Sequence, residues 1–319
     1  MRRSKLADEF EKVIIAAKGC SLTLLPELGG KVASLRADGH ELMQQPLRPL
    51  ARRATGMSFE ASDASGWDEC LPTVAACALE TASGTVELAD HGDLWRTAWR
   101  VTARETDAVT MVARCASLPL ELTRSMMLAG TDRGWRLRVL YSLRNVGGER
   151  APWCWAAHPL FACDGGDTVR LPESVKRVRV EFSRGERVGA AGEWIDWPRG
   201  QLRGVAYALD EAAEAATGWG EKLFTERLRD GWCEIDRLRI GLRLRVSFDV
   251  AATPYLGLWL CHGGWPEDGA ARQMCLAAEP TTAPVDGLAT MGEWSRWLEP
   301  GATTHWPMDV EIERMTAWA

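Results

Sequence analysis

The sequence lacks an excess of positive charge. Its 319 residues contain 38 lysines and arginines against 44 aspartates and glutamates, which gives a formal net charge of −6. Binding to a nucleic-acid backbone depends on a positive field that neutralises phosphates. Nucleic acid is therefore not an expected partner.

Long apolar runs are also missing. The longest, such as residues 13–17, fall far short of the roughly 20 apolar residues that a membrane helix requires. A secretion signal is not expected either, because Asp8, Glu9 and Glu11 interrupt the apolar core that such a signal needs. We expect no membrane partner.

Paired cysteine motifs are absent as well. The nine cysteines are odd in number and scattered, and no two of them form a C-x-x-C pair. This pattern is typical of reduced thiols, most of them small core residues, and does not fit a disulfide framework or a structural zinc site. It predicts a cytoplasmic protein.

The composition is that of an ordinary globular chain, with 46% hydrophobic and 26% charged residues. No linker, repeat or low-complexity segment divides the sequence, so we expect a single domain over residues 1–319 with about 1–12 mobile. The 16 tryptophans stand against only 3 tyrosines and 6 phenylalanines. Tryptophan suits both stacking on sugar rings and a large β core, and composition does not choose between the two.

Alternation of apolar and polar residues recurs along the chain and indicates strands with one buried face. Helical patterning is confined to short pieces such as residues 210–216, and residues 210–217 are expected to be irregular. Glycine-containing turns separate the alternating runs. The pattern predicts an all-β sandwich or barrel with few helices. The clearest expected strands cover residues 109–113, 135–144, 238–248 and 306–312.

Three polar clusters stand out as candidate sites. His91 precedes a glycine that permits close approach of backbone or ligand, and His158 lies among tryptophans and other apolar residues. A histidine in apolar walls has its pKa biased downward, and a neighbouring carboxylate restores it toward neutrality. Glu279 ends an apolar run before a proline-containing loop. Burial of a carboxylate at such a position costs free energy unless a function requires it there. The alternatives are a structural histidine and a strand-end glutamate that faces solvent.

Taken in order, these segments resemble the aldose 1-epimerase (galactose mutarotase-like) superfamily over most of the chain. Residues 25–35, with their glycine pair, are similar to the opening hairpin of that family. The segments 91–96 and 158–161 resemble its two histidine motifs, and 279–287 resembles its C-terminal glutamate motif. The resemblance implies a β-supersandwich of large antiparallel sheets with a concave face that binds a sugar.

The resemblance also implies roles for individual residues in an isomerase that needs no cofactor. His158 would protonate the pyranose ring oxygen, and Glu279 would remove the proton from the anomeric hydroxyl. Opening and reclosure of the ring would then interconvert the α and β anomers of an aldose. His91 would bind the substrate through a hydrogen bond. The ligand would be a small carbohydrate, either a free aldose or a sugar phosphate.

The chain departs from the family pattern at two substrate-binding positions. Acidic residues, Asp68 and Glu69, stand where the family has an arginine, and we take Asp68 as the candidate hydroxyl acceptor with Glu69 as its rival. Glu221 and Lys222 stand near the place of a family aspartate, and a surface lysine is the ordinary interpretation of Lys222. These departures concern which sugar is bound.

Two further residues are candidates for binding substrate. The planar fork of Arg96 suits a hydroxyl or a phosphate. His262 lies in a segment with two glycines and a tryptophan that could stack on a sugar, or it belongs to a strand-end turn.

Two other functions stay open. The first is a non-catalytic sugar-binding or sensing protein on the same fold. The second is a metal site formed by His91, His158, His262, Glu279 and a cysteine, which no H-x-x-x-H or C-x-x-C spacing supports, so we expect no metal. The sequence leaves the choice between monomer and homodimer open.

Overall fold

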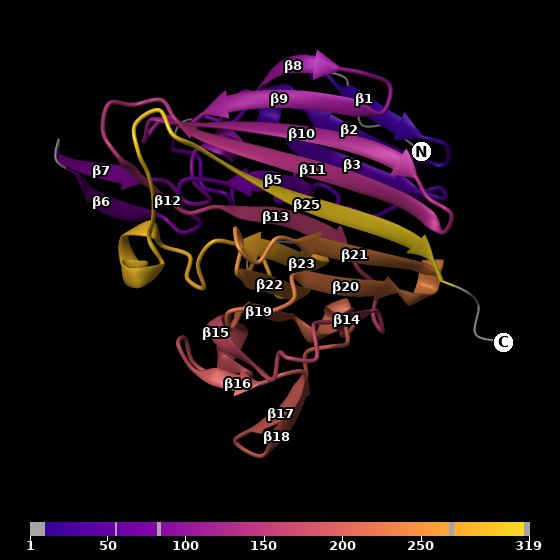
Figure 1. The fold of residues 1–319 in the computed structure, drawn as a ribbon. Helices are drawn as coiled ribbons and strands as arrows, with labels where there is room; N and C mark the ends of the chain where they lie inside the picture. Colours follow the sequence, from indigo (N-terminus) through magenta and orange to yellow (C-terminus); the bar gives the residue numbers. More distant parts are fainter. Residues whose placement is uncertain (1–9, 55, 82–83, 268–270, 316–319) are drawn as a thin grey trace.

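Two large antiparallel β-sheets pack face to face in the computed structural model (Figure 1). The structure describes residues 10–54, 56–81, 84–267 and 271–315. Buried apolar side chains from both sheets form one continuous core between them. The all-β sandwich expected from the sequence is thus confirmed.

The larger sheet has 11 strands and carries the residues discussed below. In spatial order it contains β1 (Val13–Ala17), β2 (Cys20–Leu25), β3 (Lys31–Ala37), β5 (Trp67–Cys70), β13 (Ala156–Ala162), β23 (Met274–Thr281), β22 (Tyr255–His262), β19 (Trp219–Thr225), β15 (Arg177–Ser183) and β16 (Trp194–Asp196), with β4 (His40–Glu41) paired to β3.

The second sheet has eight strands and covers one face of the first. It runs β14 (Thr168–Arg170), β20 (Trp232–Arg237), β21 (Leu242–Phe248), β25 (Thr303–Arg314), β11 (Gly134–Asn145), β10 (Leu120–Gly130), β9 (Ala108–Arg114) and β8 (Arg100–Arg104). Three short hairpins or pairs complete the fold: β6 (Cys77–Thr81) with β7 (Gly84–Leu88), β12 (Ala151–Trp153) with β24 (Arg296–Leu298), and β17 (Arg199–Leu202) with β18 (Val205–Ala208).

The alternating pattern of the sequence accounts for the strand β11 in the middle of the second sheet. Its burial alternates along the strand, and each apolar residue of the pattern faces the other sheet because side chains in a strand point to opposite faces in turn. The five residues concerned, Trp135, Leu137, Val139, Tyr141 and Leu143, are all buried. The expected strands at 109–113, 135–144 and 306–312 are confirmed.

The expected strand 238–248 is wrong in its first part. Leu238–Ile240 forms a short 3-10 helix, and β21 begins only at Leu242. Gly241 separates the two with a φ of 67°, a left-handed conformation that ends the helical turn and redirects the chain.

The helical pattern at residues 210–216 is also wrong for most of its length. Only Ala215–Thr217 forms a 3-10 helix. Ala212 is buried, and its backbone N–H donates to the carbonyl of Asp167. Tertiary hydrogen bonds thus replace helical ones, which agrees with the expected irregular segment.

Two further expectations concern the first dozen residues and the nine cysteines. The mobility expected for the first dozen residues concerns mainly residues 1–9, which lie outside the described residues, and Phe10 is buried in a small cluster with Leu25 and Leu28. All nine cysteines are free thiols, and seven are buried. Within the described ranges, no helix is long and apolar enough to cross a membrane.

Candidate active site

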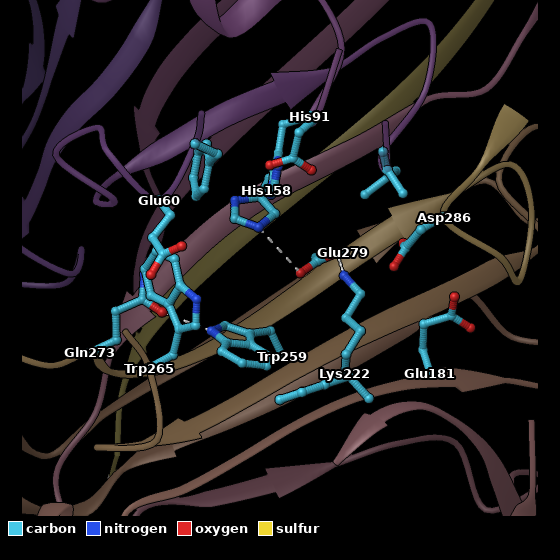
Figure 2. A pocket seen from close by; sticks show the side chains of 15 residues that line it. Glu60, His91, His158, Glu181, Lys222, Trp259, Trp265, Gln273, Glu279 and Asp286 are labelled. Atoms are coloured by element: carbon cyan, nitrogen blue, oxygen red, sulfur yellow. Dashed lines mark hydrogen bonds and ion pairs between the residues drawn. The ribbon is translucent and has the colours of Figure 1, made fainter. Parts of the chain in front are cut away.

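A cavity of about 350 Å³ opens on the face of the 11-stranded sheet that points away from the second sheet. Figure 2 shows the polar side chains that converge on it. The lining residues are Phe59, Glu60, Val74, Ala75, Asp90, His91, His158, Glu181, Phe182, Lys222, Trp259, Trp265, Gln273, Glu279 and Asp286.

The pairing of two central strands brings His158 and Glu279 together. Strands β13 and β23 are antiparallel neighbours, and their register places the two residues opposite one another on the same face of the sheet. His158 is 6% exposed and Glu279 is 1% exposed. The Nε2 atom of His158 lies 3.7 Å from Oε1 of Glu279. The glutamate is therefore a buried residue of the cavity, and it does not face open solvent.

The two oxygens of Glu279 have different surroundings. Oε2 accepts a hydrogen bond from the ammonium group of Lys222, and this is also an ion pair. Oε1 is buried and has no hydrogen-bond partner among the residues that the structure describes. Unpaired buried polar atoms are rare in proteins because their desolvation is not compensated. Oε1 is thus free to accept a proton from a bound molecule.

Lys222 is the main correction to the sequence-based interpretation. It lies on β19, is only 9% exposed and points into the cavity, so it is not a surface lysine. Burial alone would lower the pKa of Lys222, but the negative charges of Glu279 and Asp286 outweigh burial and raise the pKa. Lys222 is therefore charged at neutral pH and holds Glu279 in place.

The environment of His158 favours the neutral imidazole. Burial lowers the pKa of His158 well below 6.5, and the nearby His91 and Lys222 lower it further. The Nδ1 atom of His158 has no hydrogen-bond partner in the described part of the chain. The expected restoration of the pKa by a neighbouring carboxylate is therefore incomplete.

His91 reaches the cavity from a strained turn. Its φ is 58°, an uncommon conformation for a residue with a side chain, and its N–H donates to the carbonyl of Val74. Gly92 must be glycine because an added Cβ would lie 2.2 Å from the carbonyl oxygen of Leu71. The close approach expected from the His-Gly pair is thus made by backbone.

Aromatic contacts fix the imidazole of His91. The ring of Phe59 stacks on it with 3.8 Å between centroids and 11° between planes. The ring of His158 meets His91 edge to face, with centroids 4.9 Å apart. Nδ1 of His91 lies 3.1 Å from a carboxylate oxygen of Asp90. His91 therefore has a defined orientation next to His158.

Tryptophans form the opposite wall. Trp259 lies on β22 between Lys222 and the strand that carries Glu279, and its Nε1–H donates to Gln273 over 2.8 Å. Trp265 also lines the cavity. Flat apolar faces beside polar groups suit the stacking of a sugar ring. Of the other tryptophans, eight are buried, as expected for a large β core; stacking of Trp259 or Trp265 on a sugar stays a prediction.

Neither Asp68 nor its rival Glu69 lines the cavity, although Asp68 lies opposite His158 in the pairing of β5 with β13. Asp68 is 1% exposed and forms ion pairs with Lys31, over 2.6 Å, and Arg53, over 3.1 Å. Glu69 points to the opposite face and pairs with Arg124 in the core. Both carboxylates are already neutralised, and neither lines the cavity.

Arg96 and His262 do not line the cavity either. Arg96 lies over the ring of Trp95, 5.6 Å from its centroid, and 3.9 Å from Asp93. His262 is 4% exposed and neither ring nitrogen has a hydrogen-bond partner in the described ranges. Burial, followed by the charge of Arg187, lowers the pKa of His262 to about 4.

The described residues do not form a metal-binding site from the ligands considered in the sequence. No three histidine, cysteine, aspartate or glutamate side chains among them are placed to hold one ion. The separation of His262 from His91 and His158 removes one of the ligands considered from the sequence.

Several residues that line the cavity were not predicted, because no motif in the surrounding sequence distinguishes them from other strand residues. Lys222 was considered only as a surface residue, although it occupies an alternating position in a strand-like segment. Trp259, Glu181 and Phe182 lie in strands whose neighbours in space are distant in the sequence. Asp286 belongs to the segment 279–287 that was singled out, and this was the one available signal.

Comparisons with known proteins place the fold. The sequence matches no family model and no curated protein. Its structure is similar to that of an Escherichia coli protein provisionally named an aldose 1-epimerase, with a TM-score of 0.70, 16% identity and coverage of 96% of this chain and 100% of that one.

Two further structures extend this similarity. A galactose mutarotase-like protein from Lactobacillus casei gives a TM-score of 0.68 at 17% identity, over 95% of this chain and 100% of that one. An aldose epimerase homologue from C. elegans gives 0.65 at 12% identity, over 96% and 100% of the two chains. The similarity spans nearly the whole chain at low identity, and it establishes that this protein has the galactose mutarotase-like fold.

Proposed function

We propose that the protein is an aldose 1-epimerase, an enzyme that interconverts the α and β anomers of a sugar. One observation carries the proposal: His158 Nε2 and the unpaired Oε1 of Glu279 lie 3.7 Å apart in a cavity walled by tryptophans. The two groups can reach the ring oxygen and the anomeric hydroxyl of one hemiacetal, since these atoms share a carbon.

The reaction then needs only proton transfers. Oε1 of Glu279 takes the proton of the anomeric hydroxyl, the electron pair of that O–H bond forms the C1 carbonyl, and the bond between C1 and the ring oxygen breaks. Protonated His158 gives its proton to the ring oxygen. After rotation about the C1–C2 bond, the same steps run in reverse on the other carbonyl face. Each positioned acid or base contributes roughly 10²–10⁴-fold in rate.

One proton is shared by the pair throughout the cycle. It starts on His158 and, after ring opening, the pair again holds one proton, now on Glu279. Lys222 supports this arrangement because its ammonium group holds Oε2 by a hydrogen bond and an ion pair, which leaves Oε1 as the base. His91, held by Phe59, stands beside His158 and can donate or accept a hydrogen bond with a sugar hydroxyl.

The names of the structural neighbours support the same reaction. Two of the similar structures bear names that include aldose epimerase, and a third is called galactose mutarotase-like. The resemblance seen in the histidine and glutamate motifs points to the same residues, His158 and Glu279, that the fold brings together.

The test is NMR saturation exchange between the anomers of glucose, galactose and other aldoses, with and without protein. We expect exchange above the buffer rate for at least one sugar. The substitutions His158→Gln and Glu279→Gln should each reduce the added exchange by at least ~10²-fold. His305→Gln and Glu299→Gln, at exposed positions, are the matched controls and should leave exchange unchanged.

A non-catalytic sugar-binding protein is the second candidate. Two observations favour it. One carboxylate oxygen of Glu279 is already engaged in an ion pair with Lys222. Burial also lowers the pKa of His158, which reduces the fraction of protonated imidazole available as an acid. Binding of aldoses without any exchange above the buffer rate would establish this alternative and contradict the enzymatic proposal.

A further inference from the structure

The cavity has many more acidic than basic groups. Its only lysine or arginine among the described lining residues is Lys222, whereas five of the lining residues carry carboxylates. These are Glu60, Asp90, Glu181, Glu279 and Asp286.

Some of these carboxylates are already neutralised. Lys222 pairs with Glu279, and Arg179, which is not among the lining residues, pairs with Glu181 over 2.5 Å. Asp90 lies next to His91. For Asp286 and Glu60, no ion pair exists within the described part of the chain. An empty cavity therefore retains uncompensated negative charge.

Asp286 is the most informative of these groups. Its backbone carbonyl accepts hydrogen bonds from the N–H groups of Val74, over 3.0 Å, and Ala75, over 2.9 Å, so its position is fixed. Its Oδ1 is buried, and no group in the described ranges forms a hydrogen bond with it. Figure 2 shows its carboxyl group directed toward Lys222 and the cavity. A second buried oxygen of the same cavity, Oε1 of Glu279, is also unpaired.

The excess of carboxylates in the cavity should disfavour the binding of anionic groups and favour that of cationic groups. A phosphate group carries a charge of about −1.5 to −2 at neutral pH and would meet carboxylates without an arginine to bind it. An ammonium group would place donors at Oδ1 of Asp286 and reduce the repulsion between Asp286, Glu279 and Glu181. Burial raises the pKa of Asp286; the charge of Lys222 opposes this effect, and that of Glu279 adds to it.

We propose that the cavity selects sugars by charge: it binds amino sugars, whose ammonium group meets Asp286, at least as well as neutral aldoses, and it excludes sugar phosphates and sugar acids. This inference rests on the proposed function in taking a sugar as the ligand. The stacking face of Trp259 and the hydrogen-bonding groups of His91 serve all these sugars equally, so the discrimination comes from Asp286.

Isothermal titration calorimetry with the whole protein tests the selection independently of catalysis. The probes are glucose, glucosamine, N-acetylglucosamine, glucose 6-phosphate and glucuronate at low salt. N-acetylglucosamine keeps the substituent on the ring carbon but removes its charge. We expect glucosamine to bind at least as tightly as glucose, and at least about tenfold more tightly than either anion.

The substitution Asp286→Asn removes one charge at nearly constant shape. It should reduce the preference for glucosamine over glucose 6-phosphate by about tenfold, whereas binding of N-acetylglucosamine should change little. Asp132→Asn, in the exposed turn between β10 and β11, is the matched control with the same change of net charge and should leave the preference intact.

Other results would overturn the inference. These are binding of glucose 6-phosphate as tight as that of glucosamine, weaker binding of glucosamine than of glucose, no binding of any probe, or an unchanged preference in the Asp286→Asn protein. Failure of the proposed function looks different: sugars would bind in the expected order of charge, and their anomers would exchange no faster than in buffer.

Discussion

Two buried glutamates on opposite faces of the same sheet, Glu69 and Glu279, differ in how their oxygens are used. Glu69 is 0% exposed, and its carboxylate accepts hydrogen bonds from Arg124 over 2.8 Å, Tyr141 over 3.0 Å and Trp155 over 2.9 Å. Glu279 is 1% exposed, but only Oε2 is bonded, to Lys222, and Oε1 is unpaired.

The difference separates a structural carboxylate from the one that we propose acts as a base. A buried charge whose hydrogen bonds are all made by the protein joins the two sheets and has no capacity left for a ligand. A buried charge with one free oxygen keeps its desolvation penalty and can reduce it by binding another molecule. Between these two glutamates, the unpaired oxygen, rather than burial or charge alone, distinguishes the one that lines the cavity.

The largest effect is expected at the structural carboxylate. Arg124→Met leaves Glu69 charged and without its ion pair in the core, and should lower the free energy of unfolding by about 3–5 kcal/mol. Urea denaturation followed by tryptophan fluorescence measures this. Arg138→Met is the control, since Arg138 is exposed and lies 3.7 Å from Asp309, and should change stability by less than about 1 kcal/mol. Equal losses in both variants would contradict the structural role of Glu69.

The next effect is expected at Glu279, the proposed base. Lys222→Met removes the cation that holds Oε2 of Glu279, so the proposed base loses its ion pair and its fixed orientation. We expect anomer exchange to fall by about 10–100-fold, equivalent to about 1.4–2.8 kcal/mol. Lys176→Met, at an exposed position, is the control. Exchange at the wild-type rate would show that Lys222 does not act through Glu279.

The pH dependence of exchange sharpens the same comparison. Burial, with the charges of His91 and Lys222, lowers the pKa of His158 well below 6.5, so its protonated fraction decreases as pH rises above that pKa. The enzyme-catalysed rate at low substrate should then fall with increasing pH, by at most about tenfold per unit. Saturation exchange from acidic to neutral pH, after subtraction of the buffer rate, measures this. A rate that rises over this range would contradict His158 as the acid.

The smallest effect is expected at His262. This residue is buried outside the cavity, and its ring nitrogens have no hydrogen-bond partner in the described ranges. His262→Leu should leave anomer exchange within about twofold of wild type and cost little or no stability, because replacing an unsatisfied polar group by an apolar one is near neutral. A large loss of exchange would restore His262 to the sugar site.

The sequence predicted the strands better than the contacts between them. The alternation at residues 135–144 specifies a strand because one face must be buried, and no distant residue is needed to recognise it. Residues 238–240 show the same alternation of apolar and polar residues, but they form a 3-10 helix that the left-handed conformation of Gly241 separates from the strand. Period-two patterns do not show where a neighbouring turn interrupts them.

The candidate site was predictable only in part. The motifs around His91, His158 and Glu279 were visible along the chain, and the fold brings these three residues to one cavity. Asp68 was chosen over Glu69 as a sugar-binding residue, yet Lys31 and Arg53 already hold it. Lys31 and Arg53 lie in segments distant from Asp68 in the sequence, so no local sequence pattern predicts these ion pairs.

By itself, the sequence determined the all-β fold class and pointed to the two histidines and the glutamate that we propose for acid–base chemistry. The tertiary structure decided which acidic residues are free. Strand pairing placed Lys222 on Oε2 of Glu279 and left Oε1 open beside His158. It also satisfied Glu69 completely in the core. The physical reason is that the charge state and availability of a buried group depend on partners distant in the sequence, which only the packed sheets bring within hydrogen-bonding distance.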